Sequence, residues 1–471
     1  MNRVKFFLND SLAPDISVIN QIKTISKWEG VKSVSVFPDL SFKSKEIIPT
    51  GVVFDTDDLI YPIAIKSNFN CGITVIKTSL YYKDLDHNKI SLIYKHLKDA
   101  FSDRKNSYWQ ISRVDLNDII YKGVEWAKDR VGLSDSDQKN IEDEGSFFKN
   151  TDFTFKEVLN NIPSDVYQGG FKKLGSMWVG NHFLEMSRVS KVIDNDIAKT
   201  WGIEKDQIIF MIHGEPGAFG GRIGKYFMDR KDLSLKELIR KHRYHFTLNI
   251  KKYSKRRSAY FNTHSSPFAI EADSDEARRY ISCAYAAANY GFVNRVLAYK
   301  LVQDIVVKYI DKNVKMEILI DVAHKIIKQE DLGGRKFWVH RNGASLALGP
   351  SFIKSHSLYS KTGQPVPLPG SMTAGSYICA AKDESSKSLF SVNHGTGRRI
   401  SKKEIKEMTT NEDVYNLLRE EGVHIERMGD GDISGASPEG YKDLDIVAKT
   451  ISDFGLVKSV VKLKPIGVLK G

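Results

Sequence analysis

The sequence Ser-Val-Asn-His-Gly-Thr-Gly-Arg-Arg around His394 combines residue types that phosphate chemistry requires. An unperturbed histidine has a pKa of about 6.5, so a neutral imidazole is available near neutral pH to attack a phosphorus atom. Gly395 and Gly397 permit positive φ, which would let a bulky ligand approach the backbone closely. Arg398 and Arg399 could hold a phosphate through paired guanidinium donors. The same stretch is also compatible with a structural histidine in a glycine-rich turn, so the rest of the chain has to decide between them.

Cys71 lies at a break between two expected strands, residues 62–66 and residues 73–76. Most free cysteines are small buried hydrophobes, and this is one interpretation of Cys71. The other is a thiolate metal ligand, with Asn68 three residues earlier. Sequence position alone leaves both interpretations open.

Three more histidines lie in or after strand-like segments. His182 belongs to an alternating run, residues 181–186, which predicts a strand with His182 and Glu185 on opposite faces. His213 follows an apolar strand and precedes a glycine-rich loop, and His324 also follows an apolar run. A histidine at a strand end is common in ligand sites, yet a satisfied polar core is equally compatible with these patterns.

The composition favours a reducing compartment and an anionic partner. The 471 residues are 41% hydrophobic, carry a net charge of +12 and include three cysteines. So few cysteines predict no disulfide framework, and we expect a cytoplasmic location. No apolar run reaches roughly 18 residues and no signal-peptide core is expected, so we expect no membrane partner. Residues 238–260 are basic with interleaved aromatic residues and could follow a nucleic-acid backbone, although a solvated charged face is an equally good interpretation.

The expected elements run along the chain without a linker rich in proline, glycine or serine. A short strand over residues 33–37 should end at Pro38-Asp39. Asp273 and Glu276 resemble a capping box and predict a long helix that reaches about Lys312. Length alone would suggest about three domains. Because the candidate residues are scattered over most of the chain, we instead expect one domain over residues 1–471.

Taken in order, these stretches resemble the RtcB family of RNA-splicing and RNA-repair ligases. The similarity covers nearly the whole chain from Pro38 to Gly471. Any one motif is weak, but the ordered set is specific. Its carriers are Asn70-Cys-Gly72, Gly180-Asn-His-Phe-Leu-Glu185, Met211-Ile-His-Gly214, Ala288–Arg295, Asp321-Val-Ala-His324, Val339–Ala344, Gln364–Met372, Asn393–Arg398, Tyr441-Lys-Asp443 and Val468-Leu-Lys-Gly471.

The resemblance implies a fold, an activity and a set of metal ligands. The fold would be a single large α+β domain of mixed β-sheets surrounded by helices, with a central dinuclear metal site. The activity would join an RNA 3′-phosphate or 2′,3′-cyclic phosphate to a 5′-hydroxyl, using GTP and two Mn²⁺ ions, with His394 as the guanylylated nucleophile. The implied metal ligands are Asn68, Cys71, His182, His213 and His324, with Cys71 bridging the two ions.

The resemblance also implies a nucleotide site and partners. Asn181 would touch nucleotide phosphate, and a group of polar residues would surround the guanine. Lys325 could supply a further phosphate contact, and Gly395 and Gly397 would shape the loop around the nucleophile. The implied partners are RNA with broken ends, tRNA among them, and an archease-like activating protein. The residues expected around the guanine are Glu185, Ser371, Ser376, Tyr441 and Lys470.

Three departures from the family pattern lie near this chemistry. Asn68 stands where the family usually has aspartate, and Lys325 stands where it usually has asparagine. The loop after His213 reads Gly-Glu-Pro-Gly and lacks the family's arginine. We therefore expect the ion near Asn68 to bind more weakly than the other, unless a neighbouring group already balances the charge. The alternatives to a ligase are an RNA-end-binding protein without turnover and a metal-dependent phosphodiesterase that opens cyclic phosphates.

Overall fold

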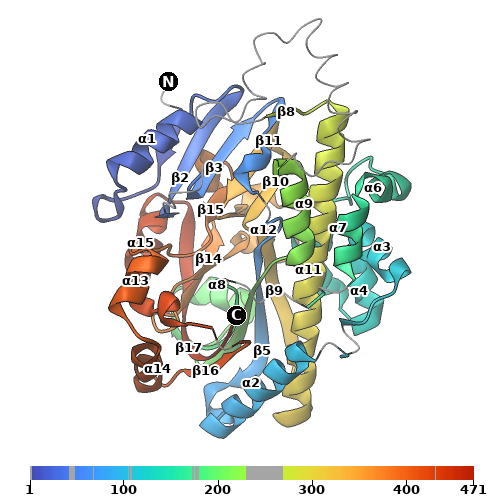
Figure 1. Cartoon of the computed structure of the whole chain (residues 1–471). Helices are drawn as coiled ribbons and strands as arrows, with labels where there is room; N and C mark the ends of the chain where they lie inside the picture. Colours follow the sequence, from blue (N-terminus) through green and yellow to red (C-terminus); the bar gives the residue numbers. More distant parts are fainter. Residues whose placement is uncertain are drawn as a thin grey trace, which may run out of the picture.

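Two β-sheets form the framework of the protein, and helices cover them (Figure 1). The five-stranded sheet has the order β1-β2-β3-β11-β10, and the eight-stranded sheet has the order β13-β14-β17-β6-β7-β5-β9 with β16 paired to β17. The mixed α+β architecture implied by the resemblance is confirmed, whereas the single-domain organisation stays a prediction. The computed structural model describes residues 3–41, 48–66, 68–103, 105–106, 109–171, 174–175, 180–229, 269–429 and 431–471.

The elements have the following bounds. The strands of the five-stranded sheet are β1 (Val4–Phe6), β2 (Val31–Ser41), β3 (Thr50–Thr56), β10 (Lys325–Leu332) and β11 (Arg335–Asn342). Those of the eight-stranded sheet are β5 (Gly72–Tyr81), β6 (Phe183–Val192), β7 (Gln207–Gly214), β9 (Met316–Ala323), β13 (Pro365–Pro369), β14 (Ser376–Ala381), β16 (His424–Arg427) and β17 (Val457–Lys470). Two small sheets pair β4 (Leu59–Ile60) with β8 (Ile270–Glu271) and β12 (Ala344–Leu346) with β15 (Ser391–Asn393). The helices are α1 (Ile16–Ile25), α2 (His87–Ser102), α3 (Arg113–Lys122), α4 (Val124–Val131), α5 (Asp135–Lys139), α6 (Phe155–Asn161), α7 (Ser164–Gly170), α8 (Asn195–Trp201), α9 (Ala218–Asp229), α11 (Asp275–Tyr309), α12 (Tyr359–Thr362), α13 (Lys402–Met408), α14 (Asn411–Glu420) and α15 (Leu444–Asp453).

Strand β7 shows why the centre of the large sheet is apolar without alternation. Its two faces belong to two different hydrophobic clusters, so successive side chains are buried in opposite directions. Ile208, Phe210 and Ile212 enter the cluster that also contains the buried face of α11. Ile209 and Met211 enter the cluster on the other face. A strand buried on both sides needs apolar residues at successive positions, as residues 208–212 of β7 have.

Helix α11 is the long helix beside the large sheet, and it packs against β5 and β7. It begins after Ser274, whose side chain accepts the Ala277 N–H. The expected capping box from Asp273 and Glu276 is therefore wrong by one position, because the chain turns into the helix at Ser274. The helix ends at Tyr309, three residues before the predicted end.

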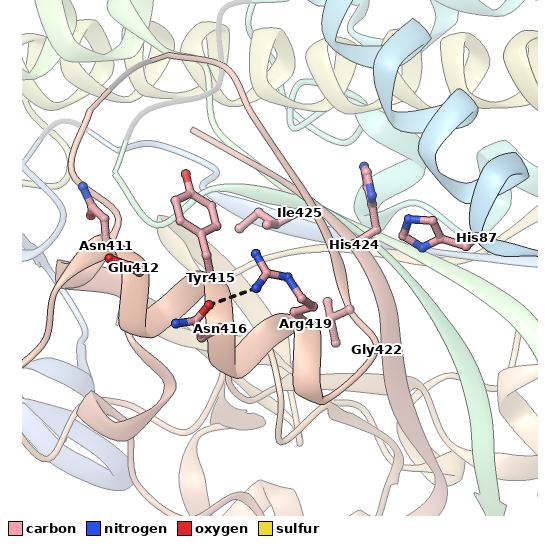
Figure 2. Close-up of a pocket in the computed structure, with 10 residues that line it drawn as sticks. His87, Asn411, Glu412, Tyr415, Asn416, Arg419, Gly422, His424 and Ile425 are labelled. Carbon is pink, nitrogen blue, oxygen red and sulfur yellow. Dashed lines mark hydrogen bonds between the residues drawn. The ribbon is translucent and has the colours of Figure 1, made fainter.

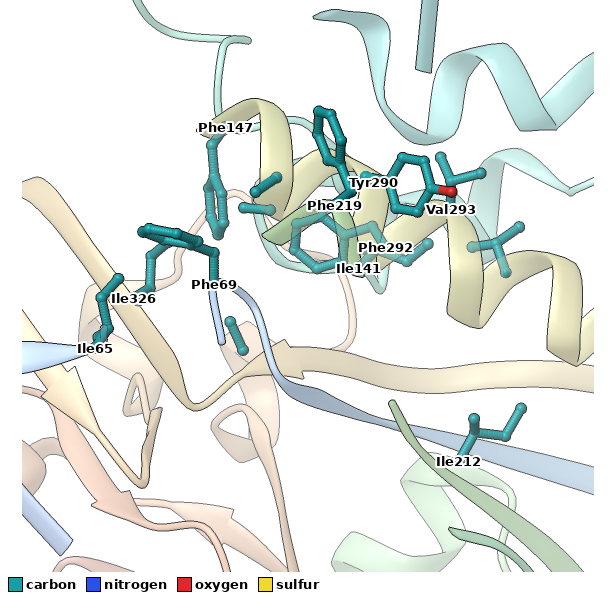
Figure 3. Packing of buried hydrophobic residues seen from close by; sticks show 14 of the residues in the cluster. Ile65, Phe69, Ile141, Phe147, Ile212, Phe219, Tyr290, Phe292, Val293 and Ile326 are labelled. Atoms are coloured by element: carbon teal, nitrogen blue, oxygen red, sulfur yellow. The ribbon is translucent and has the colours of Figure 1, made fainter. Parts of the chain in front are cut away.

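A cluster of aromatic side chains fixes α11 against the turn that precedes β5 (Figure 3). The rings of Phe147 and Phe292 have centroids 5.3 Å apart, and those of Phe219 and Tyr290 are 5.1 Å apart. Phe69, which is fully buried in the same cluster, lies two residues before Cys71. The hydrophobic core therefore anchors the segment that leads into Cys71.

Two predicted strands differ from the structure. Residues Pro62–Ala64 form a 3-10 helix, since proline at its start lacks the N–H that a strand ladder would use. Strand β2 does not end at Pro38 but continues to Ser41, with irregular pairing to β3 between Val36 and Ser41. Proline is tolerated in such an irregular segment. This continuation carries Asp39 into the interior.

The basic segment of residues 238–260 lies outside the described residues. Within the part of the chain that the structure describes, no helix combines the length and the apolar character that crossing a bilayer requires.

Candidate metal and nucleotide site

Four adjacent strands bring Cys71, His182, His213 and His324 to one end of the large sheet. Strands β6, β7, β5 and β9 are antiparallel neighbours, so the starts of β5 and β6 lie at the same end as the finishes of β7 and β9. Cys71 precedes β5, His182 precedes β6, His213 is near the end of β7, and His324 follows β9. The register pairs Gly72 with both Gly214 and Ala323 and pairs Phe183 with His213.

The donor atoms of these residues are in direct contact around the cysteine sulfur. Cys71 Sγ lies 3.3 Å from His182 Nε2 and 3.2 Å from His213 Nε2. His213 Nε2 lies 3.3 Å from His324 Nε2. All four side chains are buried. Cys71, His182 and His213 form a group whose ligand atoms lie within 4.8 Å of one another, close enough for a shared ion.

The electrostatics of this cluster fit a divalent cation. Burial lowers the pKa of His213 and of His324 well below the usual value, and the charge of neighbouring histidines lowers both further. The two rings are therefore neutral and have a lone pair for a metal. Burial also raises the pKa of the Cys71 thiol, and the charge of Glu215 adds to this rise. A bound cation would reverse that balance and hold the thiolate. Sulfur and imidazole donors suit a borderline metal such as manganese or zinc better than magnesium.

A buried ion pair positions the loops that carry these ligands. Arg295 of α11 is fully buried and bonds Asp321, with Nη2 2.6 Å from Oδ1. The same guanidinium donates to the backbone oxygens of Asn70, at 2.9 Å, and Gly214, at 3.0 Å. Gly72 makes room for it, because a Cβ there would lie 2.8 Å from Arg295 Nη2. One side chain thus ties the residue before Cys71 to the residue after His213.

His394 lies beside this cluster, and a buried carboxylate fixes its ring. Its Nδ1 lies 2.7 Å from Asp39 Oδ2 and 2.9 Å from Gly343 O. Both partners are acceptors, so Nδ1 carries the proton and the neutral ring has its lone pair on Nε2. The ring centroid is 4.4 Å from that of His324 and 6.4 Å from that of His213. The His394 side chain keeps 22% of its surface exposed, so a ligand can reach it.

The surroundings of Asp39 keep this contact in place. Burial raises the pKa of Asp39, while the hydrogen bond and charge of His394 and the charge of Lys442 oppose the rise. Lys442 donates to the backbone oxygens of Pro38 at 2.7 Å and Leu40 at 2.8 Å, which anchors the strand on either side of the aspartate.

The glycines after His394 act differently from the sequence-based expectation. Gly397 has φ +72°, and a Cβ there would lie 2.5 Å from Asp39 O, so its role is close packing against β2. Gly395 does not adopt positive φ, and a Cβ would lie 3.0 Å from Pro369 O. The expectation that both glycines use positive φ is therefore wrong for Gly395.

Glu185, Ser376 and Lys470 meet on β6, β14 and β17. Burial raises the pKa of Glu185 to about 7, while the hydrogen bond from Ser187 and the charge of Lys470 oppose the rise. Burial lowers the pKa of Lys470 to about 7, and the positive charges of Lys402 and Arg398 contribute in the same direction. Lys470 Nζ also lies 3.3 Å from Asn181 O, and Asn181 is exposed next to His182.

The remaining expected nucleotide residues lie around this group. Arg398 stacks on Tyr441, with the guanidinium carbon 4.7 Å from the ring centroid, and also donates to Gly435 O. Arg399 is exposed and donates to Glu439 O at 2.9 Å, so only Arg398 faces the predicted site. The Ser371 hydroxyl accepts the Ala374 N–H within its own turn.

Asn68, Lys325 and Glu215 occupy the edge of the metal cluster. The backbone oxygen of Asn68 accepts the Cys71 N–H at 3.0 Å, and that of Lys325 accepts the Asn70 N–H at 2.8 Å. Glu215 Oε2 lies 3.7 Å from His182 Nε2. Burial raises the pKa of Glu215 to about 7, and the charge of Lys325 opposes this rise.

Sequence reasoning assigned no role to Asp39, Arg295 or Glu215. The available signals were Asp39 in the Pro-Asp pair, Arg295 in an apolar helix, and Glu215 two positions after a candidate ligand. A charged residue inside an otherwise apolar segment is the only hint that such positions give, because charged side chains are buried only with a partner.

A surface pocket of about 770 Å³ lies at the other end of β16 (Figure 2). His424 begins this strand and lines the pocket, whereas Arg427 ends it and pairs with Lys470. On α14, Arg419 donates to Asn416 at the pocket wall at 3.0 Å. The pocket is therefore separate from the metal cluster, although one short strand connects them.

A buried thiol–imidazole cluster beside a carboxylate-oriented histidine has the donor types that metal-assisted phosphoryl or nucleotidyl transfer requires. Residues 21–471 match the family described as tRNA-splicing ligase RtcB, and the chain belongs to this family. Curated relatives named tRNA-splicing ligase RtcB include one from Methanococcus maripaludis, 28% identical over 96% of this chain and 91% of the relative. Another, from Aeropyrum pernix, is 28% identical over 99% of this chain and 93% of the relative. A third, from Nanoarchaeum equitans, is 29% identical over 88% and 82% of the two chains.

Proposed function

We propose that this protein is an RNA ligase that joins an RNA 3′-phosphate or 2′,3′-cyclic phosphate end to a 5′-hydroxyl end. The reaction would pass through a guanylate on His394 and use GTP and two Mn²⁺ ions. Membership of the RtcB family supports RNA ligation. The observation that carries the histidine step is the pair of acceptors on Nδ1, which leaves Nε2 of an accessible ring as the nucleophilic atom beside the metal cluster.

The residues that would hold the ions are those at the end of the large sheet. Cys71 and His182 would hold one ion, and Cys71, His213 and His324 would hold the other, because the sulfur contacts the imidazoles of both groups. When bound, a pair of divalent ions neutralises phosphate charge and increases the electrophilicity of phosphorus.

His394 would supply the covalent step. Nε2 attacks the α-phosphorus of GTP, a P–N bond forms, and the bond between the α-phosphorus and the bridging oxygen breaks with release of pyrophosphate. Positive charge develops on the imidazole during attack. Asp39 accepts the Nδ1 proton in a hydrogen bond and stabilises that charge without being protonated itself.

The guanylate on His394 would then activate the 3′-phosphate of the RNA. A terminal phosphate monoester is a poor electrophile, because attack on it would have to expel an oxide. Transfer of GMP from His394 to that phosphate gives it a phosphate leaving group, and the 5′-hydroxyl can then attack with release of GMP. Arg398 and Lys402, whose positive charges act on Lys470, lie near the expected nucleotide position and suit an anionic substrate.

Incubation with α-labelled GTP and Mn²⁺ tests this proposal. The wild-type protein should acquire an acid-labile, alkali-stable label, as a phosphoramidate does, and His394→Ala should acquire none. His87→Ala, which changes an exposed histidine at the surface pocket, is the matched control and should be labelled normally. A wild-type protein that binds RNA ends without label would favour an RNA-end-binding protein. One that opens cyclic phosphates without GTP would favour a phosphodiesterase.

Cys71→Ser tests the bridging thiolate, because serine has a similar volume but is not ionised at neutral pH. The variant should contain less metal after purification with little change in its unfolding curve. Unchanged metal content would instead identify Cys71 as a core side chain.

A further inference from the structure

Glu215 is the acidic side chain in contact with the thiol–imidazole cluster. Its Oε2 lies 3.7 Å from His182 Nε2, and the side chain is only 13% exposed. That oxygen is buried and makes no hydrogen bond within the described residues. A buried carboxylate oxygen without a partner is costly, so a cation or donor is expected to meet it.

The donor atoms form an ordered series with the sulfur in the middle. From Cys71 Sγ one path leads to His213 and then His324, with steps of 3.2 Å and 3.3 Å. A second path leads to His182, at 3.3 Å, and then to Glu215, a further 3.7 Å away. Two donors that share one ion at tetrahedral angles are about 3.4 Å apart when each bond is about 2.1 Å. The step from His182 to Glu215 is close to that spacing, and the donor atoms of Cys71, His182 and His213 all lie within 4.8 Å of one another.

The backbone around Glu215 holds it at this position. Its carbonyl accepts from Asn294 Nδ2 of α11 at 3.0 Å, and the preceding Gly214 carbonyl accepts from Arg295 at 3.0 Å. Two adjacent residues of one buried helix thus fix the loop after β7. Although Glu215 is only two residues from His213, this loop brings its carboxylate to within 3.7 Å of His182 Nε2.

We propose that Glu215 is a direct carboxylate ligand of the ion held by Cys71 and His182. This assignment rests on the two-ion site of the proposed function. It would give each ion a comparable set of donors, with sulfur, nitrogen and carboxylate oxygen on one and sulfur and two nitrogens on the other. It also supplies the negative charge that Asn68, an amide, does not. Carboxylate oxygen favours manganese more than an all-nitrogen and sulfur set does.

Lys325 is the competing partner for this carboxylate, since its charge acts on both Glu215 and Cys71. If Glu215 served only to neutralise Lys325, its replacement would leave metal binding unchanged. The number of ions bound by a Glu215 variant therefore distinguishes a metal ligand from a partner of Lys325.

The test measures Mn²⁺ bound to the full-length protein without GTP or RNA, from the electron paramagnetic resonance signal of the free ion. Wild type should bind two ions per chain. Glu215→Gln should keep one and bind the other at least about tenfold more weakly, because even outer-shell substitutions cost that much. Glu317→Gln, an exposed change on β9, is the matched control and should bind two. In the double variant Asn68→Asp/Glu215→Gln, the new carboxylate at residue 68 should restore binding of the second ion.

Absorption spectroscopy with Co²⁺ distinguishes the loss of one ligand from unfolding of the protein. Glu215→Gln should keep the thiolate-to-cobalt absorption, because Cys71 and the second ion remain. Two Mn²⁺ ions bound to Glu215→Gln with wild-type affinity would overturn the proposal. Failure of the wild-type protein to form a guanylate, while Glu215→Gln still loses one ion, would overturn the proposed function and leave the assignment of Glu215 intact.

Discussion

At the scale of single residues, the contact between Asp39 and His394 determines which nitrogen can react. The two residues are 355 positions apart in sequence and meet because β2 continues past Pro38 into the interior. Without the carboxylate, the ring would keep only the Gly343 carbonyl as an acceptor for Nδ1–H and would lose the negative charge that stabilises an imidazolium.

Asp39→Asn should therefore lower the rate of guanylylation by roughly 100-fold or more while leaving the fold and metal content unchanged. Asparagine has the same shape but can donate to Nδ1, which favours the tautomer with its proton on Nε2. Single-turnover label incorporation measures the rate, and Asp57→Asn, at an exposed aspartate, is the control. Wild-type rates in Asp39→Asn would show that the carboxylate does not orient the nucleophile.

Lys470 gives a prediction about stability and pH. Its pKa in the folded protein is about 7, below the ordinary value of 10.5, because it is buried beside Lys402 and Arg398. The folded state binds fewer protons here than the unfolded state, so this contribution to stability grows as pH rises from 7 toward 10.5 and is lost as pH falls. The slope can reach about 1.4 kcal/mol per pH unit.

Urea unfolding of wild type and Lys470→Met at several values between pH 7.5 and 9.5 measures this term. This range lies above the window in which Glu185 titrates, from its ordinary 4.5 to about 7. The free energy of unfolding should rise more steeply with pH for wild type than for the variant. Parallel curves would mean that Lys470 is charged in the folded protein throughout this range.

Residue types drew attention to Cys71 and the histidines but left a core role open for each, and the family resemblance supplied the remaining candidates. The structure places His182, His213, His324 and Cys71 together, although their roles as ligands stay predictions. The sequence did not single out Asp39 or Glu215 as site residues. Carboxylates are frequent, and the partners of these two lie far away in sequence or in another loop.

At the scale of elements, the site exists because strand ends converge. Central strands such as β7 were predictable from their unbroken apolar runs, whereas the register that pairs Gly72 with Gly214 and Ala323 was not. Pairing of strands is set by contacts among distant segments, which a single sequence does not reveal. The 3-10 helix at Pro62–Ala64 shows the same limit, since its apolar residues also suit a strand.

Arg295 is the element-scale residue whose loss should be most damaging. It is fully buried, paired with Asp321, and joins α11 to the loops beside Cys71 and His213. Arg295→Met removes one partner of a buried ion pair and leaves the Asp321 charge uncompensated. We expect the free energy of unfolding to fall by about 3–5 kcal/mol.

The control is Arg278→Met, because Arg278 pairs with Asp152 and Glu157 at a side chain that is 39% exposed. That change should cost no more than about 1 kcal/mol. Guanidinium unfolding curves of the three proteins provide the comparison. Equal losses for the two variants would show that the buried network is not what holds these loops.

At the scale of the whole molecule, the site combines residues from both ends of the chain. Asp39 lies on β2, while Lys470 is the last residue of β17 and pairs with Phe183 beside His182. Figure 1 shows the C-terminus at the centre of the view, and the Gly471 N–H lies 3.5 Å from His182 O. The distribution of candidate residues along the sequence predicted this shared site. The positions of the positive charges around it could not be predicted, because the chain's 70 basic residues are spread along the whole sequence.

The positive charge near Lys470 leads to a prediction about RNA binding. Lys402 is exposed at the start of α13, and its charge acts on Lys470, so it faces the proposed substrate site. Each phosphate contact with single-stranded RNA contributes about 0.7 to the slope of log affinity against log salt, because bound counterions are released. If Lys402 contacts RNA, Lys402→Gln should weaken binding and reduce the magnitude of that slope by about 0.7.

Its neighbour Lys403 provides a matched control. Lys403 is 89% exposed on the same helix, whereas the charges that act on Lys470 are those of Lys402, Arg398, Glu185 and Arg427. Lys403→Gln should therefore leave the salt dependence close to that of wild type. Fluorescence anisotropy with a labelled single-stranded RNA carrying a 3′-phosphate, from 50 to 200 mM salt, would measure all three proteins. The same slope for Lys402→Gln and Lys403→Gln would mean that binding senses only the overall net charge of +12. A smaller slope for Lys402→Gln alone would place the RNA backbone at the end of the sheet where Lys470 and the metal cluster lie.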